Sequence, residues 1–402
     1  LQRYNMNNME KIKFLVGNKE IKKISLSPYD KEVLDFLGDL SEDLNLTKDI
    51  KNYPDIKTFA FFCRNKNLIK MKKNFLVSSR DIRLGLGLIF HITPSNIPTN
   101  FAYSLIFGLL TGNSNIVKVP SRDFKQIDII SKSINKILSK KYKKVKEMIK
   151  IVKYKNNESF TKKISSICDA RLIWGGDQTI ENIRKYNLHA SAIDLTFADR
   201  YSLCIIDTKK FLKAKYDNLT RIVERFYNDT YVADQNACSS PHMVLWLGKK
   251  SHKAKSKFWE ELSKLVEKKY NLTHDAAIEK YTELCKKIIN DKNVKSYRTY
   301  TNNVYTVVLK NLNGSLDTYR GKWGFFYEYD IKKLEQIKKY INKKFQTLTY
   351  FGVEKVDLKD FIIKNKLQGI DRIVPVGQAL DIGFYWDGYD INNILTRVVD
   401  IR

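Results

Sequence analysis

One segment with the order strand, loop, helix, strand constrains the fold of this chain more than any other feature. The run "LGLGLIFHI" (84–92) is continuously apolar, which is typical of a strand buried on both faces of a parallel sheet. An irregular loop, "TPSNIPTN" (93–100), leads into an apolar helix at 101–110, for which Asn100 is a candidate N-cap. A second strand follows at 116–120. A crossover of this kind predicts parallel strand pairing.

The same alternation continues along the chain. It predicts a helix at 123–140, strands at 148–154 and 170–174, and a helix at 179–186. Repeated βα units predict a doubly wound, Rossmann-like domain. Together with the N-terminal helices, this domain is expected to occupy residues 1–198.

A second α/β domain is expected beyond residue 198, and we place it at 199–375. Its expected elements are a strand at 202–207, a helix at 211–228, a strand at 242–247, two helices, and strands at 303–309, 323–329 and 347–351. The remaining segment, 376–402, ends in apolar alternation. We expect it to form a strand that returns to another domain or to a partner subunit, where it would support oligomerisation.

The chain carries a formal net charge of +28, but its lysines are spread from one end to the other. Runs such as "SKKYKKVKEMIK" (139–150) place lysines at helical spacing and predict solvated helix faces. We therefore expect no nucleic-acid partner, and keep a non-catalytic, basic nucleic-acid-binding protein as an alternative of another class. The positive field favours polyanionic ligands such as nucleotides or coenzyme A.

Five cysteines lie far apart in the sequence, without a C-x-x-C pair or a cysteine–histidine cluster. This spacing predicts no metal site and a reducing compartment. The first residues are polar and lack the apolar core of a signal peptide. The longest apolar stretch, 101–110, has about half of the ~20 residues of a membrane-spanning helix. We expect a cytoplasmic protein without a membrane span.

Three loops are expected at the carboxyl ends of parallel strands, where doubly wound folds bind ligands. They are "TPSNIPTN" (93–100), "VPSRD" (119–123) and "WGGDQ" (174–178). Gly175 and Gly176, placed before a helix, suit a phosphate group, although a plain tight turn has the same pattern. Lys118 is placed to reach a phosphate or a ribose, or it is a solvated lysine at a strand edge. Asn96 is either a donor to an oxyanion or a cap of its own turn.

Cys238, in "DQNACSSPHMVLW" (234–246), lies in a polar loop before an apolar strand, whereas the other four cysteines lie in apolar or helical surroundings. The thiolate is the reactive form, and a free thiol has a pKa of about 8.5, so a nucleophile at this position needs activation. His242, in the same segment, is a candidate helper or an ordinary first residue of the strand. The residues by themselves leave Cys238 as either a nucleophile or a structural thiol.

Five segments, taken in order, resemble one family. They are "HITPSNIPTNFAYSLIFGLLTGNSNIVKVPSRD", "DARLIWGGDQTI", "IDLTFADRYS", "NDTYVADQNACSSPH" and "DRIVPVGQALDIGFYWDGYDI". Over residues 91 to 391 the chain resembles the aldehyde dehydrogenase superfamily and, within it, the LuxC-type acyl-CoA reductases. The resemblance implies an aldehyde dehydrogenase-like α/β fold, in which a Rossmann-like cofactor domain is joined to a second α/β catalytic domain.

The resemblance assigns roles residue by residue. Cys238 matches the family's nucleophile, and Asn96 matches the asparagine that forms the oxyanion hole with the nucleophile's own N–H. Lys118 matches the lysine that binds the cofactor's ribose or adjoining phosphate, and Gly175 matches the first glycine of the turn beside the cofactor. The expected cofactor-binding residues are Thr93, Pro94, Lys118, Ser121, Arg122, Gly175 and Gly176.

The chain departs from the family pattern at two positions. Oxidising relatives carry a Glu-Leu-Gly-Gly segment whose glutamate activates the deacylating water, and the corresponding "IDLTF" offers the shorter Asp194. NAD-preferring relatives hold the ribose hydroxyls with a glutamate, and that position is Ser121 here, followed by Arg122. Because Arg122 can pair with a 2′-phosphate, NADPH is the expected cofactor and NADH the alternative.

The resemblance implies a function. We expect reduction of a fatty acyl thioester to the aldehyde by NADPH through a Cys238 thioester, with coenzyme A as part of the substrate or product. Asp194 is expected to orient groups or to move a proton. The alternative within enzymes is an aldehyde dehydrogenase that oxidises aldehyde to acid, with Asp194 activating water. The resemblance also implies an acyl-protein synthetase partner and a homo-oligomer.

Overall fold

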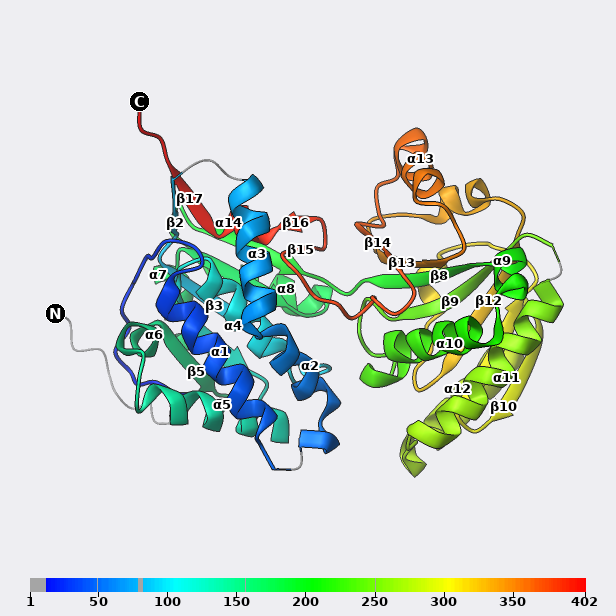
Figure 1. Ribbon diagram of the computed structural model, residues 1–402, viewed down its shortest axis with the longest axis horizontal. Coiled ribbons are helices and arrows are strands. Elements are labelled where there is room, and N and C mark those ends of the chain that lie inside the picture. Colours follow the sequence, from blue (N-terminus) through cyan, green and yellow to red (C-terminus); the bar gives the residue numbers. More distant parts are fainter. Residues whose placement is uncertain (1–11, 49, 79–81, 156, 250) are drawn as a thin grey trace. The chain divides into compact units, whose positions relative to one another are not determined.

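The computed structural model describes residues 12–48, 50–78, 82–155, 157–249 and 251–402. The chain divides into two compact units, Leu1–Ala198 with Tyr389–Arg402, and Asp199–Gly388 (Figure 1). Among the helices of the described residues, none combines the length and the apolar character that crossing a membrane requires.

The first unit is built on a six-stranded sheet within the described residues, with the strand order β1-β5-β4-β3-β6-β7. Its strands are β1 (Lys13–Val16), β3 (Leu88–Ile92), β4 (Ser114–Val119), β5 (Ile149–Lys153), β6 (Ala170–Trp174) and β7 (Ile193–Phe197). All neighbours are parallel except β1, which pairs antiparallel with β5. The parallel sheet expected from the βα alternation is therefore present.

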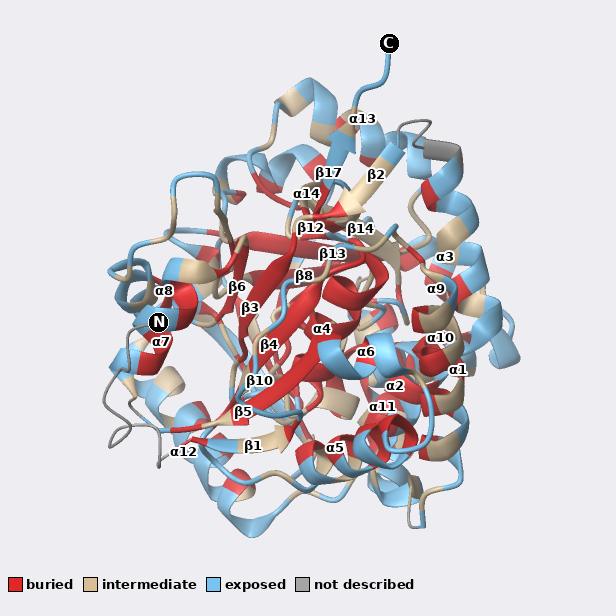
Figure 2. Ribbon diagram, turned by 90° about the vertical axis from the view of Figure 1, so that its left-hand side faces the viewer, coloured by how far each residue is buried: buried red, intermediate tan, exposed pale blue. Residues whose placement is uncertain are grey.

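Helices cover both faces of this sheet. They are α1 (Lys31–Asn45), η2 (Ile50–Asn52), α2 (Pro54–Phe62), α3 (Asn65–Ser78), α4 (Asn100–Leu110), α5 (Lys125–Leu138), α6 (Lys143–Met148), α7 (Glu158–Ile167), α8 (Asp177–Arg184) and α14 (Ile391–Ile394). The chain runs from β3 through β4 to β5 and then returns to β6 and β7 on the other side of β3. Right-handed crossovers therefore place α4 and α5 on one face and α7 and α8 on the other, as Figure 2 shows. The direction reverses between β3 and β6, which is where doubly wound folds bind ligands.

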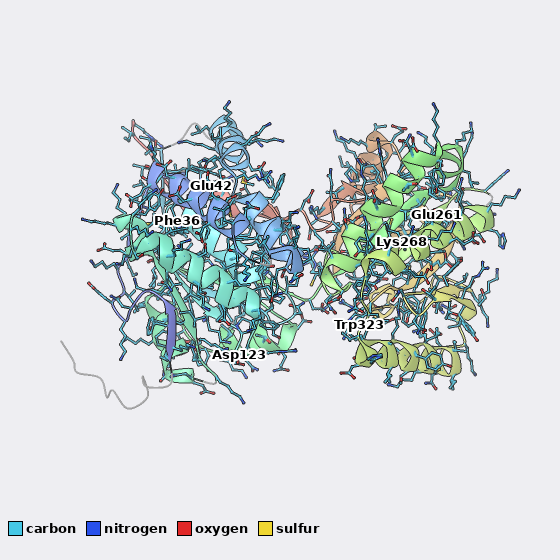
Figure 3. All side chains as sticks on the ribbon, turned by 60° about the horizontal axis from the view of Figure 1, so that its bottom comes forward. Phe36, Glu42, Asp123, Glu261, Lys268 and Trp323 are labelled. Atoms are coloured by element: carbon cyan, nitrogen blue, oxygen red, sulfur yellow. The ribbon has the colours of Figure 1, made fainter. Side chains whose placement is uncertain are left out.

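Alternating burial along the helices explains why they pack on the sheet. On α1, Phe36 is fully buried and Glu42 is exposed (Figure 3). The N-cap of α1 is Asp30, whose carboxylate accepts the N–H of Glu32 at 2.8 Å. Such a cap satisfies one of the N–H groups that the first turn leaves without a partner inside the helix.

The apolar run 84–92 was expected to be one strand, and the structure divides it into β2 (Ile82–Gly85) and β3. The division lies at Gly87, whose φ of +136° is a conformation that residues with a Cβ rarely adopt. The Asp169 carboxylate holds the first residue of β3, because it accepts the N–H of Leu88 at 2.7 Å. β2 instead pairs antiparallel with the C-terminal strand β17 (Thr396–Val399).

The second unit contains a seven-stranded sheet within the described residues, with the order β10-β11-β12-β9-β8-β13-β14. Its strands are β8 (Tyr201–Asp207), β9 (Pro241–Leu247), β10 (Val294–Thr301), β11 (Val304–Leu309), β12 (Phe325–Ile331), β13 (Phe345–Phe351) and β14 (Arg372–Pro375), and the two-residue strands β15 (Tyr385–Trp386) and β16 (Tyr389–Asp390) flank the end of the unit. Only β10 is antiparallel to its neighbour among these seven.

Two apolar layers enclose the second sheet. One layer includes Phe211, Phe226 and Phe258 from the helices α9, α10 and α11, and the other includes Leu284 and Phe361 from α12 and α13. The helices are α9 (Thr208–Lys213), α10 (Tyr216–Thr230), η3 (Tyr231–Ala233), α11 (Ser251–Lys269), α12 (His274–Asn290), η4 (Leu316–Thr318), η5 (Leu334–Tyr340) and α13 (Lys355–Asn365). The expected helix 211–228 is therefore two helices, α9 and α10.

The C-terminal segment divides between the two units. Residues up to Gly388 belong to the second unit, so its end lies beyond the expected boundary at 375. The physical reason is hydrogen bonding, because the N–H groups of Gly377 and Ala379 both donate to the carboxylate of Asp229 on α10. The last residues return to the first unit as β17. A return to another domain was one of the two destinations expected for this tail.

The break at Gly87 yields a stability prediction. A Cβ at this position would lie 2.5 Å from a carboxylate oxygen of Asp169, and the φ of +136° is itself unfavourable for alanine. Gly87→Ala should lower the free energy of unfolding by about 2 kcal/mol. Urea unfolding followed by circular dichroism measures the change, with Gly383→Ala as the control because a Cβ there meets no atom within 4 Å. Equal stability of the two variants would contradict the prediction.

Candidate active site

Thr93 joins the ends of two neighbouring strands in the first unit. Its N–H and its hydroxyl both donate to the carbonyl oxygen of Lys118, at 3.2 and 3.0 Å. Because Thr93 directly follows β3 and Lys118 lies near the end of β4, the loop after β3 is tied to β4 from its first residue. The structure thus brings Thr93, the half-buried Pro94 and Lys118 together at the carboxyl edge of this sheet.

Two cationic side chains flank the end of β4. The ammonium group of Lys118 lies 5.6 Å from the centre of the Tyr154 ring, and partial burial lowers the pKa of Lys118. Ser121 and Arg122 are exposed in the following turn, with the Arg122 guanidinium 5.4 Å from the centre of the Phe124 ring. An anionic ligand at this edge would be attracted by both cations.

The turn after β6 leaves its main chain accessible. Gly175 donates its N–H to the carbonyl of Phe197 at 3.1 Å, and Gly176 is the N-cap residue of α8. A Cβ on Gly176 would meet no atom within 4 Å, whereas one on Gly175 would lie 3.1 Å from Thr179. The open space beside a helix N-terminus fits the close approach of a phosphate group.

Asn96 is exposed in the loop between β3 and α4. The helix α4 begins at Asn100, and its N-cap residue is Thr99 rather than the expected Asn100. The exposed amide of Asn96 therefore lies on the same loop as Thr93 and Pro94, and its role as a donor to an oxyanion stays a prediction.

A chain of buried polar side chains underlies these loops. His91 accepts from the Ser104 hydroxyl at Nδ1 (2.7 Å) and donates from Nε2 to Asn115 (2.9 Å), and Ser104 in turn accepts the indole N–H of Trp174 at 2.9 Å. Burial lowers the pKa of His91 to about 4, so the ring is neutral near pH 7. These bonds join β3, α4, β4 and β6 immediately below the candidate loops. Sequence reasoning missed them, because a polar residue in an apolar strand does not reveal its partner.

Asp194 occupies a different place from the other expected residues. It lies near the start of β7, opposite Arg171 on β6, and so toward the amino ends of these strands. The Arg171 guanidinium, 1% exposed, donates to both carboxylate oxygens of Asp194 at 2.7 and 2.8 Å. Another Arg171 nitrogen donates to Ser165 and to two main-chain carbonyls. This geometry gives Asp194 a structural partner, and its expected role in orienting groups or moving a proton stays a prediction.

Cys238 lies in the second unit, in the loop between η3 and β9. The loop begins with two residues in the left-handed region, Asp234 (φ 51°) and Gln235 (φ 59°). This conformation costs roughly 1 kcal/mol or more for each residue that is not glycine, so other contacts must hold it.

The side-chain amide of Gln235 supplies those contacts. Its oxygen accepts the N–H groups of Gly324 and Phe325 at 3.1 and 3.2 Å. Its nitrogen donates to the carbonyls of Pro241 and Phe325, both at 3.1 Å. One buried amide therefore fixes the start of the Cys238 loop to β9 and β12.

Trp323, labelled in Figure 3, secures the loop from a second side. Its N–H donates to the carbonyl of Asp234 at 3.2 Å, and its own carbonyl accepts from the ammonium group of Lys280 at 2.8 Å. Lys280 is 2% exposed, and burial lowers its pKa to about 7. The α12 helix is thereby connected to the loop that carries Cys238.

The far end of the loop is tied to α10. The Ser240 hydroxyl donates to the carbonyl of Asp229 at 2.7 Å, and the Asp229 carboxylate accepts the N–H groups of Gly377 (2.6 Å) and Ala379 (2.8 Å). These donors favour the charged carboxylate, but burial outweighs them and raises the pKa of Asp229 to about 7.

The sulfur of Cys238 is half-buried among charged groups. Its Sγ lies 4.0 Å from Oδ1 of Asp199, and the Ser202 hydroxyl donates to the carbonyl of Cys238 at 2.6 Å. Burial is the main cause that raises the pKa of the Cys238 thiol. Sequence reasoning did not single out Asp199, although it lies inside the quoted segment "IDLTFADRYS".

The other cysteines and His242 have different surroundings. Cys63, Cys168 and Cys204 are buried, and burial raises the pKa of both Cys168 and Cys204 to about 12. His242 is buried against the Tyr201 ring, and burial lowers its pKa to about 3, so its ring is neutral near pH 7. Its Nδ1 lies 3.0 Å from the carbonyl oxygen of Gly321. It is the ordinary strand residue that was the second interpretation.

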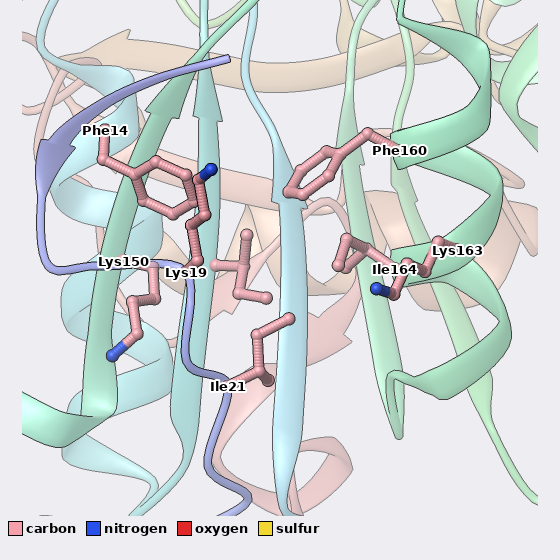
Figure 4. Close-up of a pocket in the computed structure, with 8 residues that line it drawn as sticks. Phe14, Lys19, Ile21, Lys150, Phe160, Lys163 and Ile164 are labelled. Carbon is pink, nitrogen blue, oxygen red and sulfur yellow. The ribbon is translucent and has the colours of Figure 1, made fainter. Parts of the chain in front are cut away.

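A separate hollow in the first unit contains none of the expected site residues (Figure 4). It is lined by Phe14, Lys19, Ile21, Ile116, Lys150, Phe160, Lys163 and Ile164. Lys150 follows the first residue of β5, at the amino end of the strand, so the hollow lies away from the carboxyl edge. Among the described residues, no group of three or more His, Cys, Asp or Glu side chains is arranged to hold a metal ion.

A family model described as "Acyl-CoA reductase (LuxC)" matches residues 39–398. The chain belongs to the LuxC acyl-CoA reductase family. A long-chain acyl-protein thioester reductase of Photorhabdus luminescens is 24% identical over 297 residues, which cover 72% of this chain and 58% of that protein. The protein of the same name from Aliivibrio fischeri is 27% identical over 165 residues, which cover 40% of this chain and 32% of that protein. The chain thus spans at most 58% of the length of these relatives.

Solved aldehyde dehydrogenases share the fold of this LuxC-family chain. Aldehyde dehydrogenase 21 from Physcomitrella patens superimposes with a TM-score of 0.64 at 10% identity, covering 94% of this chain and 86% of that one. Lactaldehyde dehydrogenase from Escherichia coli gives a TM-score of 0.60 at 10% identity, covering 92% and 86%. The expected aldehyde dehydrogenase-like α/β fold is confirmed.

The pairing of Asp194 with Arg171 predicts a loss of stability. Asp194→Asn leaves a buried guanidinium with a neutral partner and should lower the free energy of unfolding by roughly 3 kcal/mol. Urea unfolding of this variant is compared with that of Asp128→Asn, which removes an exposed carboxylate from α5. Unchanged stability together with lost enzymatic activity would instead support a catalytic role for Asp194.

Burial of Asp229 predicts a pH dependence of stability. Its pKa is about 7 in the folded chain and about 4 when unfolded, so the folded state binds more protons between these values. This residue therefore makes the free energy of unfolding fall as pH rises from about 4 to about 7. The unfolding free energy of the wild type minus that of Asp229→Asn should therefore decrease over that range. Denaturant titrations at several pH values measure this difference. A difference that is constant from pH 4 to pH 8 would contradict the assignment.

Proposed function

We propose that this chain reduces a long-chain acyl thioester to the aldehyde through an acyl group carried on Cys238. Membership of the LuxC family supports the reaction class. The observation that carries the residue assignment is the setting of Cys238. Its sulfur is half-buried beside a carboxylate, on a loop with two left-handed residues, whereas Cys63, Cys168 and Cys204 are packed in the core.

In the first half-reaction the Cys238 sulfur attacks the thioester carbonyl carbon, and the thiol of the donor leaves. Negative charge develops on the carbonyl oxygen, which the N–H of Cys238 and the side chain of Asn96 would stabilise. The strained loop favours this step, because Gln235 and Ser240 fix the two ends of the loop before the substrate binds.

The residues of the first unit fit a dinucleotide cofactor. Lys118 offers an ammonium group, the Gly175–Gly176 turn offers open space beside a helix N-terminus, and Arg122 offers a partner for a 2′-phosphate. A reduced nicotinamide held by these residues would supply the hydride for conversion of the acyl group to the aldehyde. We infer NADPH rather than NADH, because Ser121 stands where NAD-preferring relatives carry a glutamate. The chain therefore offers no carboxylate there to repel a 2′-phosphate.

The acyl donor is inferred to be a coenzyme A thioester or a thioester on a partner protein. The relatives are named as long-chain acyl-protein thioester reductases, which supports a long chain and a protein-borne acyl group. The family description names acyl-CoA. An acyl-protein synthetase partner, a homo-oligomer and a cytoplasmic location remain parts of this proposal.

Intact-protein mass spectrometry tests the proposal. Incubation with tetradecanoyl-CoA should add one tetradecanoyl group to Cys238, and added NADPH should remove it and yield the aldehyde. Cys238→Ala should lose the adduct, and Asn96→Ala should slow its formation by about 10²–10³-fold. Cys285→Ser is the matched control, because Cys285 is also half-buried but lies on α12.

The outcomes separate the possible functions. An adduct that persists in Cys238→Ala would overturn the assignment of the nucleophile. Release of free acid from an aldehyde with NADP⁺, without reduction of any thioester, would favour the oxidative alternative. The oxidative alternative needs Asp194 to activate a water molecule. The carboxylate of Asp194 instead forms an ion pair with Arg171, which favours the reductive function.

A further inference from the structure

Asp199 places a carboxylate at the sulfur of Cys238, and the proposed function does not yet use it. Its Oδ1 lies 4.0 Å from Sγ, within the reach of a thiol hydrogen bond. The same oxygen accepts from Nη1 of Arg320 at 2.9 Å. All three groups belong to the second unit.

Both members of this ion pair are held in place. Asp199 precedes β8 by two residues, and Tyr201 at the start of β8 donates its N–H to the carbonyl of Lys344 at 2.7 Å. Arg320 donates from Nε to the carbonyl of Asp317 at 3.0 Å, and its guanidinium lies 5.7 Å from the centre of the Tyr201 ring. The carboxylate is thereby oriented before a substrate arrives, as efficient proton transfer requires.

Burial, together with two nearby carboxylates, keeps the Cys238 sulfur protonated at rest. Burial is the largest influence that raises the pKa of Cys238, and Asp199 and Asp387 add to it. The main chain of Arg200, by hydrogen bonding, and the positive charge of Arg320 act in the opposite direction without reversing the shift. The resting nucleophile is therefore a thiol, and its attack on a thioester needs a group that accepts the proton.

A carboxylate suits this task for a chemical reason. The S–H proton is weakly acidic in the free thiol and becomes strongly acidic once the sulfur bonds to the acyl carbon. The proton affinity of a carboxylate lies between these extremes, so transfer becomes favourable as the bond forms. His242 is buried against the Tyr201 ring and the Asp194 carboxylate is paired with Arg171, so we assign this role to neither of them.

We propose that Asp199, oriented by Arg320, is the general base that receives the Cys238 proton during acyl transfer and returns it to the departing thiol. The inference rests on the proposed function and adds a catalytic residue to it. The Cys238 sulfur forms a bond to the acyl carbon while its proton moves to Asp199. When the bond from that carbon to the donor sulfur breaks, the donor sulfur leaves with the electron pair and takes the proton from Asp199. No oxidant or reductant takes part in this half-reaction.

Two rate measurements on Asp199→Asn test the proposal, both made without cofactor. The first is alkylation of Cys238 by iodoacetamide, which requires only the thiolate. Removal of a neighbouring negative charge should lower the thiol pKa and accelerate alkylation roughly tenfold at pH 7. The second is acylation of Cys238 by tetradecanoyl-CoA, which should become about 10²-fold slower at pH 6.5.

The pH profile supplies the decisive signature. Acylation of the wild type should be nearly independent of pH between 6.5 and 8, because transfer of the proton to Asp199 frees the attack from its dependence on preformed thiolate. In Asp199→Asn the rate should rise about tenfold per pH unit, because attack then depends on free thiolate. Asp387, whose pKa burial raises to about 6, also faces this site, and the range begins above that value for this reason. Asp360→Asn, which removes a half-buried carboxylate that pairs with Lys364 on α13, is the matched control.

Each outcome decides the matter. Faster alkylation with slower acylation supports a general base, and Asp199→Glu should then restore part of the flat pH profile. Acceleration of both reactions would overturn the proposal, since Asp199 would only suppress the thiolate. Slowing of both, or an unchanged pH profile, would overturn it as well. If the wild type forms no acyl adduct at all while iodoacetamide still labels Cys238, the proposed function fails and not this inference alone.

Discussion

Parallel strand pairing is the constraint on which the rest of this structure depends. Parallel neighbours cannot be joined by tight turns, so every connection must cross from one end of the sheet to the other. In both units the loops after the strands therefore collect at one edge, while helices occupy the faces. At the edge of the first sheet this arrangement brings Thr93 and Lys118 into direct contact, although a whole helix separates them in the sequence. The polar loops do not have to form a core and are free to carry chemistry.

Sequence patterns predicted the elements whose signal is local. The apolar segment 170–174 is the strand β6, and 148–154 contains β5, because continuous apolar runs of this length fit a strand covered on both faces. The run 84–92 failed as a single strand, because its division depends on the φ of Gly87 and on Asp169, which is far away in the sequence. The strand β10 was not predicted, since most of its residues are exposed and it lies at the edge of its sheet.

In the candidate site, too, the sequence predicted the local features but not the contacts between residues that lie far apart in the chain. The position of Cys238 in a loop before a strand could be predicted, because composition distinguishes it from the core cysteines. Asp194 was chosen because the resemblance called for a carboxylate in that segment, but a sequence does not show that Arg171 already binds it. Asp199 and Arg320 could not be found as a pair, since they lie 121 residues apart in the sequence and only the fold brings them together. Charge pairs of this kind are properties of the packed chain.

The pairing of β17 with β2 has a consequence for how the chain is made. The first unit is discontinuous, because the whole second unit is inserted between Ala198 and Tyr389. During synthesis β2 leaves the ribosome well before the strand that covers its edge, because the whole second unit lies between them in the sequence. Until then the nascent first unit exposes an unpaired strand edge, which is a template for wrong pairing. The inserted unit has no such delay, since all of its seven sheet strands are already synthesised. The two-stranded sheet of β2 and β17 can therefore close only after the inserted unit has been synthesised.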